Sequence, residues 1–168
     1  MRRPAFSLLL LASLCGCVTA YKWTSSVPEK MRTVAVPTFR NNSDVTELGS
    51  VVSRQVLREI QREGTFKIRR QDDAAVEVQG TITSASSGYG ASDRRAGSRF
   101  GEYAFIVTAN VSVIDRVNGR VLIDNRTYVG QTTYVIGQDK LTGERNASGR
   151  AAEDIAMQVV DDLTSMQW

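Results

Sequence analysis

The chain has 168 residues, of which 42% are hydrophobic and 23% are charged, and it contains no histidine. Without histidine there is no Ser-His-Asp or Cys-His catalytic centre, and the commonest general base and zinc ligand is missing. The 21 basic and 18 acidic residues give a net charge of only +3. That excess is too small to indicate a generic nucleic-acid-binding protein.

The first 16 residues have the order of an export signal. Arg2 and Arg3 precede an apolar stretch from Ala5 to Leu14, as in secretory signals. A helix needs roughly 20 apolar residues to cross a bilayer, so this shorter stretch does not predict a permanent span. Removing Arg2 and Arg3 with the signal leaves 19 basic against 18 acidic residues, so most of the apparent basicity belongs to the signal.

The end of this segment, Leu14-Cys15-Gly16-Cys17, resembles the lipobox of bacterial lipoproteins, whose cysteine carries the lipid. We therefore expect lipidation at Cys17. The alternative is that the two cysteines form a disulfide or are incidental, but Cys15 and Cys17 are too close in sequence for an easy unstrained bridge. By resemblance to the sorting rule of two-membrane bacteria, in which aspartate after the cysteine retains the protein in the inner membrane, Val18 points to the outer membrane.

The remaining residues predict a tether and one domain. Residues 17–32 are polar and show no period, which predicts a lipidated tether before a domain over 33–168. A short strand is expected over Thr33–Phe39, with an irregular end at Pro37. Asn41–Asp44 supplies turn and capping chemistry. An amphipathic helix follows, ending at Gly64; its apolar positions are Leu48, Val51, Val52, Val56 and Ile60.

The middle of the chain predicts strands. We expect strands over Phe66–Arg70 and Ala75–Ala85, the second with one buried face. Ser86–Gly101 is rich in Gly, Ser and Arg and predicts a long exposed loop. Tyr103–Asp115 and Val121–Tyr134 alternate around Asn118-Gly119, which is a strong hairpin signal.

A second amphipathic helix is predicted at the end of the chain. It follows a polar loop containing Gly137 and Gly143, and its apolar positions are Ala152, Ile155, Ala156, Val159, Val160 and Leu163. The element order predicts an α+β fold, in which a mixed β-sheet of about five strands carries the two amphipathic helices on one face.

Two pairs of carboxylates are the residues that a hydrolase or a metal site would use. Asp72-Asp73 falls in a turn between strands, and Asp161-Asp162 falls on the solvated face of the last helix. A site needs further converging groups, so a surface role fits both pairs better. Gly88-x-Gly90 lacks the strand–turn–helix context of a phosphate loop. We expect no catalytic residue, no metal site and no cofactor.

The predicted long loop holds a basic cluster with aromatic neighbours. Arg94, Arg95 and Arg99 lie between Tyr89 and Phe100. Guanidinium groups bind phosphate through two parallel hydrogen bonds, which would suit the phosphorylated sugars of lipid A or an anionic headgroup. The alternative is a solvated loop kept soluble by its arginines. Both interpretations remain open.

The ordered set of motifs resembles the LptE family, the lipoproteins of the outer-membrane lipopolysaccharide translocon. The matching pieces are the lipobox at Cys17, the segments 34–43, 73–80, 115–122 and 150–156, the helix before Gly64, and the strand opening Glu102-Tyr103. One departure concerns ligand binding: family members often carry arginine directly after this tyrosine, and here that residue is Ala104. Arg99 or the Arg94-Arg95 pair would have to substitute for it.

The resemblance implies a non-enzymatic protein of the outer membrane. Such proteins plug the LptD β-barrel as its heterodimer partner, assist its assembly and support lipopolysaccharide insertion, with lipopolysaccharide itself as a ligand. A compact domain without catalytic inventory suits a polar barrel lumen. The alternative is an envelope lipoprotein that scaffolds or activates a cell-wall enzyme or a secretion pore, because single motifs of this set also occur in such proteins. Neither interpretation involves nucleic acid.

Overall fold

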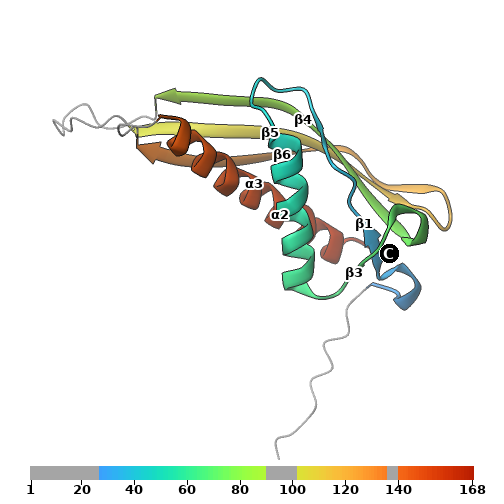
Figure 1. Ribbon diagram of the computed structural model, residues 1–168. Helices are drawn as coiled ribbons and strands as arrows, with labels where there is room; N and C mark the ends of the chain where they lie inside the picture. The colour runs from blue at the N-terminus through green and yellow to red at the C-terminus, as the bar shows by residue number, and fades with distance from the viewer. Residues whose placement is uncertain (1–26, 90–101, 136–139) are drawn as a thin grey trace, which may run out of the picture.

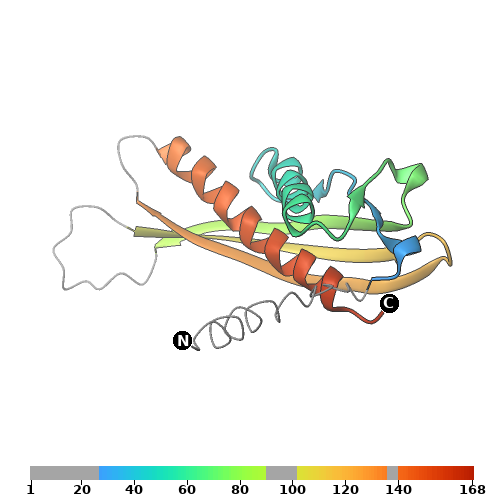
Figure 2. The same cartoon turned by 90° about the horizontal axis from the view of Figure 1, so that it is seen from below.

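The computed structural model describes residues 27–89, 102–135 and 140–168 (Figure 1). They form two layers, a mixed β-sheet and two helices that both lie on one face of it (Figure 2). The helices are α2 (Leu48–Glu63) and α3 (Lys140–Ser165), with 3₁₀ turns η2 (Glu29–Met31) and η3 (Gln71–Asp73). The strands are β1 (Thr33–Ala35), β2 (Arg40–Asn41), β3 (Lys67–Ile68), β4 (Val76–Tyr89), β5 (Glu102–Asp115) and β6 (Arg120–Val135). The predicted α+β fold with both helices on one face is confirmed.

The sheet runs in the order β3-β1-β4-β5-β6, with β2 also paired to β4. The three long strands are antiparallel, and the short β1, β2 and β3 are parallel to their neighbours. The predicted hairpin is therefore confirmed as β5 and β6. The expected strand over Thr33–Phe39 is wrong in part: it is interrupted after Ala35 and resumes as β2, which makes six strands.

The core lies between the sheet and the helices. Alternate residues of the long strands face the helices because side chains along a strand point to opposite faces. The core residues of the strands include Val76, Val78, Ile82, Phe105, Val107, Ala109, Val111, Val113, Tyr128 and Tyr134, and those of the helices include Leu48, Val52, Val56, Ile60, Ala152, Ile155, Val159 and Leu163. Apart from Tyr128 and Tyr134, these are periodic apolar positions of the sequence, so the period identified the buried faces of the two helices and of β4 and β5.

Helix α2 ends as predicted but begins differently. Gly64 has a φ of 85°, and its N–H donates to the Ile60 carbonyl at 3.1 Å, which closes the helix. At the start, the preceding residue is Glu47, and no side-chain hydrogen bond caps the helix. The expected capping role of Asn41–Asp44 is therefore wrong. Asn41 instead organises the turn, since its amide oxygen accepts the Ser43 N–H at 3.1 Å.

Two predicted loops are shorter than expected. Strand β4 continues to Tyr89, so the first residues of the expected loop Ser86–Gly101 are in the sheet. They pair with β5 from Ser86↔Ile106 to Tyr89↔Tyr103, and this backbone ladder needs no apolar side chains. Helix α3 begins at Lys140, so Gly143 lies inside the helix and not in a polar loop.

The end of the predicted tether is folded. Val27 and Met31 are buried in the core. The Nε of Arg32 donates to the Val27 carbonyl at 3.0 Å. The Met31 N–H donates to the Pro28 carbonyl at 2.8 Å and closes the turn η2. These apolar contacts are isolated in sequence and carry no period that would have revealed them.

Three side chains of α3 cover the outer edge of β6. The Arg150 guanidinium donates to the Thr133 carbonyl at 2.9 Å, and the Gln158 amide donates to the Val129 carbonyl at 2.9 Å. Between them, the Asp154 carboxylate accepts the Gln131 N–H at 3.2 Å. This edge ladder satisfies backbone groups that an edge strand otherwise leaves open to another chain.

Candidate functional site: the open face of the sheet

Among the described residues, the face of the sheet opposite the helices carries no charged side chain across its centre, and we call this surface the open face. Its residues share an orientation away from α2 and α3, as the strand register fixes. They are Gln79, Thr81, Ser84, Ser86 and Gly88 of β4, Ala104, Ile106, Thr108, Asn110 and Ser112 of β5, and Thr127, Val129, Gln131 and Thr133 of β6. In a chain of which 23% is charged, such a surface is unusual for a solvated face.

Two large apolar side chains lie on the open face beside its hydroxyl and amide groups. Ile106 is 38% exposed and Val129 is 44% exposed. Single apolar residues on a surface need no explanation. The lack of charged side chains is a feature that the open face shares with the centres of protein–protein interfaces.

A polar hollow opens at one end of the open face. Pairing with β4 is interrupted between Ala35↔Glu77 and Arg40↔Thr81, so four residues of the β1–β2 segment face three of β4. Pro37 lies in this gap and has no N–H to give to a ladder. The segment leaves the sheet there, and a hollow of about 330 Å³ lies beside β4.

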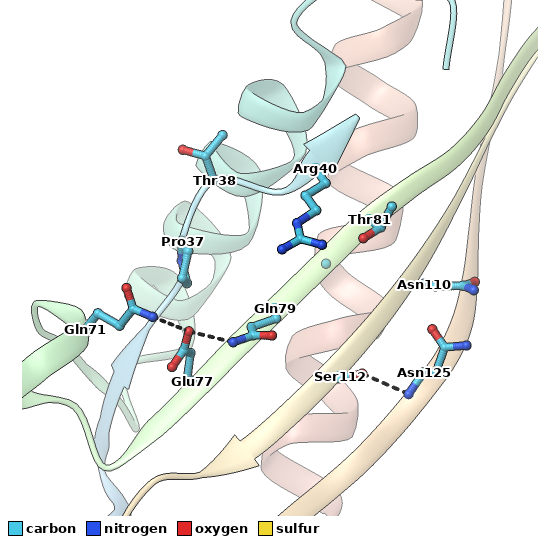
Figure 3. Close-up of a pocket in the computed structure, with 11 residues that line it drawn as sticks. Pro37, Thr38, Arg40, Gln71, Glu77, Gln79, Thr81, Asn110, Ser112 and Asn125 are labelled. Carbon is cyan, nitrogen blue, oxygen red and sulfur yellow. Dashed lines mark hydrogen bonds between the residues drawn. The ribbon is translucent and has the colours of Figure 1, made fainter. Parts of the chain in front are cut away.

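Phe39 holds the β1–β2 segment in place beside the hollow. Its N–H donates to the Ser53 hydroxyl of α2 at 2.8 Å, and its ring is buried. A Cβ on Gly80 would lie 2.2 Å from that ring, so the packing of Phe39 requires glycine there. Because Phe39 points into the core, its neighbour Arg40 points to the other side, towards the hollow (Figure 3).

Amides and hydroxyls line most of the hollow (Figure 3). Gln79 and Thr81 of β4 and Asn110 and Ser112 of β5 belong to the open face, so the hollow is continuous with it. Asn125 completes the lining from β6, where its φ of 43° belongs to a bulge opposite Ser112.

Glu77 is a buried carboxylate in the wall of the hollow. Its Oε1 accepts the Gln71 amide at 2.6 Å and the Gln79 amide at 2.9 Å, and its Oε2 pairs with the Arg116 guanidinium. Both oxygens are therefore already engaged, and the negative charge is compensated. A buried, fully bonded carboxylate of this kind organises its surroundings and is not poised as a general base.

Asp115 organises the turn between β5 and β6. Its Oδ1 accepts the N–H groups of Val117 and Asn118 at 3.0 Å each, and its Oδ2 accepts the Asn118 amide at 2.7 Å and pairs with Arg120 at 3.2 Å. The side-chain bond from Asn118 is the largest cause that lowers the pKa of Asp115, and burial opposes it. The ionised carboxylate of Asp115 therefore holds the hairpin turn in place.

A second polar cluster lies on the helix side of the sheet. The Tyr128 hydroxyl donates to the Asp162 carboxylate at 2.6 Å, and Arg126 pairs with the same carboxylate at 2.8 Å. Burial and then the bond to Asp162 raise the pKa of Tyr128 well above its usual value. The phenol stays protonated, so this cluster fastens α3 to β6 and offers no nucleophile.

The residues proposed from sequence as lipidation and ligand sites, Cys17, Arg94, Arg95 and Arg99, lie outside the described residues. The two carboxylate pairs are described. Asp72 and Asp73 lie exposed in η3 between β3 and β4, as expected. Of the other pair, Asp161 is exposed, whereas Asp162 is half-buried by its bonds to Tyr128 and Arg126.

Within residues 27–89, 102–135 and 140–168, no three acidic or cysteine side chains gather closely enough to hold a metal ion. None of the described helices is both long enough and apolar enough to span a bilayer. Ala104, which follows the tyrosine that opens β5, lies on the open face.

Sequence reasoning did not find the hollow. Arg40 lies in a segment that carries the family resemblance, but nothing in its spacing marks it as a ligand-binding residue. The available signal was Pro37 inside a predicted strand, which indicated an irregular end. The sheet register decides where β2 resumes. It also decides which polar residues of β4, β5 and β6 meet there.

The solved structures that resemble the chain show the fold. A putative lipoprotein from Caulobacter crescentus has a TM-score of 0.50 at 13% identity, covering 76% of this chain and 89% of that one. A minor lipoprotein from Acinetobacter baumannii has 0.52 at 12%, covering 80% and 94%. The hypothetical protein CT253 from Chlamydia trachomatis has 0.53 at 10%, covering 80% and 96%.

Among curated proteins, none matches the sequence. The model of one protein family, described as LptE, lipopolysaccharide-assembly, matches residues 31–163. This range includes α2, all the strands and nearly all of α3. The chain therefore belongs to the LptE family of lipopolysaccharide-assembly lipoproteins of the bacterial envelope.

Proposed function

We propose that the chain is an outer-membrane lipoprotein, anchored through Cys17, that plugs an LptD-type β-barrel and assists its assembly. In that complex it supports the insertion of lipopolysaccharide into the outer leaflet. The family match supports a role in lipopolysaccharide assembly. The observation that carries the partnership is the uncharged open face, which we propose as the surface that meets the barrel wall.

The physical argument concerns desolvation. The inner wall of an outer-membrane barrel is polar, in contrast to its lipid-facing side. A plug that presented charges to this wall would have to remove them from water, which costs several kcal/mol for each ion that lacks a well-placed partner. Hydroxyl and amide groups such as those of Thr108 and Gln131 hydrogen-bond to a polar wall at a much smaller cost. The exposed arginines of α2, among them Arg58, lie in the other layer.

The test is a purification of the tagged full-length chain from detergent-solubilised membranes. We expect an outer-membrane β-barrel in near-equal amount, and we expect Cys17→Ala to lower its recovery. Thr108→Glu combined with Val129→Glu places charge at the centre of the open face and should remove most of the barrel. Met157→Glu is the matched control, because Met157 is an exposed residue of α3.

Two outcomes would contradict the proposal. Equal recovery of the barrel by the open-face variant and by the control would exclude the open face as the docking surface. Recovery of a cell-wall synthase or a secretion pore in place of a barrel would favour the alternative function, a lipoprotein that scaffolds or activates such a partner.

A further inference from the structure

Several acceptor oxygens in the lining of the polar hollow beside β4 are already in use, which leaves the donors next to them available. Both carboxylate oxygens of Glu77 are engaged by Gln71, Gln79 and Arg116. The amide oxygen of Asn110 accepts the Thr127 hydroxyl at 3.0 Å. An amide whose oxygen is occupied still offers its N–H groups.

The same holds for Ser112. Its hydroxyl oxygen accepts the Asn125 N–H at 2.9 Å, which leaves its own O–H to donate elsewhere. Gln71 and Gln79 each use one N–H on Glu77 and keep a second. The lining therefore offers several N–H and O–H donors to a ligand that accepts hydrogen bonds.

Arg40 adds a positive charge to this lining. Within the part of the chain that the structure describes, its guanidinium forms no ion pair and no side-chain hydrogen bond. Figure 3 shows it beside Thr81, turned towards the hollow. The planar guanidinium fork matches phosphate through two parallel bonds.

The size of the hollow argues for more than a bare ion. Its volume of about 330 Å³ lies at the lower end of the range for small-molecule sites, about 300–1,000 Å³. Besides Arg40 and the Glu77 carboxylate, whose oxygens are engaged, the polar side chains of the lining are amides and hydroxyls, which suit the hydroxyl groups of a saccharide. We propose that this hollow binds the phosphate ester of a sugar, with Arg40 on the phosphate and Gln79 and Asn110 on the sugar hydroxyls.

The ligand has two possible sources. For one of them, the proposal rests on the proposed function and deepens it. The sugar phosphate could belong to the headgroup of a glycolipid such as lipopolysaccharide, or to a soluble molecule. The chemistry at Arg40 is the same for both. The hollow is separate from the arginines of residues 94–99 in the sequence, so the two sites are distinguishable by substitution.

The experiment is calorimetric titration of the full-length chain in detergent micelles with glucose 1-phosphate, inorganic phosphate and glucose. Glucose 1-phosphate should bind most tightly. Arg40→Gln should weaken it at least about tenfold, because a charge-assisted bond is lost, and Arg40→Lys should lie between. Asn110→Asp, which adds a carboxylate to the lining, should abolish binding. Arg58→Gln is the matched control and should leave affinity within about twofold, since exposed distant charges are screened.

Failure has a distinct signature. Absence of glucose 1-phosphate binding to the unchanged chain, or equal affinity in Arg40→Gln, would overturn the proposal whatever partner co-purifies. A second arm adds detergent-dispersed lipopolysaccharide as a competitor. Displacement of glucose 1-phosphate would identify the glycolipid headgroup as the source, and binding without displacement would identify a soluble sugar phosphate. Loss of the barrel interaction alone would leave this site standing, because the titration uses the isolated chain.

Discussion

Gly130→Ala tests how closely α3 approaches the sheet. A Cβ on Gly130 would lie 2.0 Å from the carbonyl oxygen of Ala151 and 2.9 Å from Cγ1 of Ile155, whereas ordinary contacts begin at 3.4 Å. The first obstacle is the backbone of α3, which cannot rotate away as a side chain can. The helix would have to move away from β6 as a unit, which would strain the edge ladder at Arg150 and Asp154.

The magnitude follows from overpacking. Inserting a methyl group into a well-packed site costs about 1–3 kcal/mol, and we expect about 3 kcal/mol here because the obstacle is backbone. For a chain of this size each kcal/mol lowers Tm by about 2–4 °C, so Tm should fall by about 6–12 °C.

The assay is urea and thermal unfolding of the full-length chain followed by circular dichroism. Gly149→Ala is the control, because a Cβ there has nothing within 4 Å and the position lies in the interior of α3. Alanine should raise the free energy of unfolding by about 0.5–1 kcal/mol at such a position. If Gly130→Ala were as stable as the unchanged chain, the close packing of α3 on β6 described above would be refuted.

Three further predictions concern buried polar groups. Ser53→Ala leaves the Phe39 N–H without its acceptor and should cost about 1–3 kcal/mol in urea unfolding; a change within error would mean that Phe39 finds another acceptor. Tyr128→Phe removes the bond to Asp162 and should cost about 1 kcal/mol by the same measurement; no loss would exclude a stabilising role. The pKa of Asp115 is lowered on folding, so its contribution is present above the unfolded pKa and is lost as pH falls through the folded one. Asp115→Asn should therefore flatten the fall in stability below about pH 4, and an unchanged acid profile would contradict that assignment.

The helices and the long strands could be predicted because burial repeats with a fixed period. The period from Leu48 to Ile60 fixes α2, and Gly64 ends it in a left-handed conformation that favours glycine. The alternation from Phe105 to Val113 likewise fixes the buried face of β5.

The sequence was less informative where backbone pairing replaces apolar side chains. The composition around Ser86 and Ser87 predicts a loop, yet the two residues extend β4 because β5 continues opposite them. Asn125 gave no signal either, since its place at the hollow results from a bulge in the register of β5 and β6. The hollow is assembled from five separate segments, and a linear pattern carries no information about which of them meet.

The edge ladder between α3 and β6 depends on two repeat distances, one along the helix and one along the strand, that are nearly equal. Four residues of helix, as from Arg150 to Asp154 and on to Gln158, advance about 6.0 Å. Two residues of strand, as from Thr133 to Gln131 and on to Val129, advance about 6.7 Å. The mismatch is small for one step and grows with each further one, so a helix can follow a strand edge in this way for only a few rungs. Within those rungs the edge of β6 is closed to a further strand.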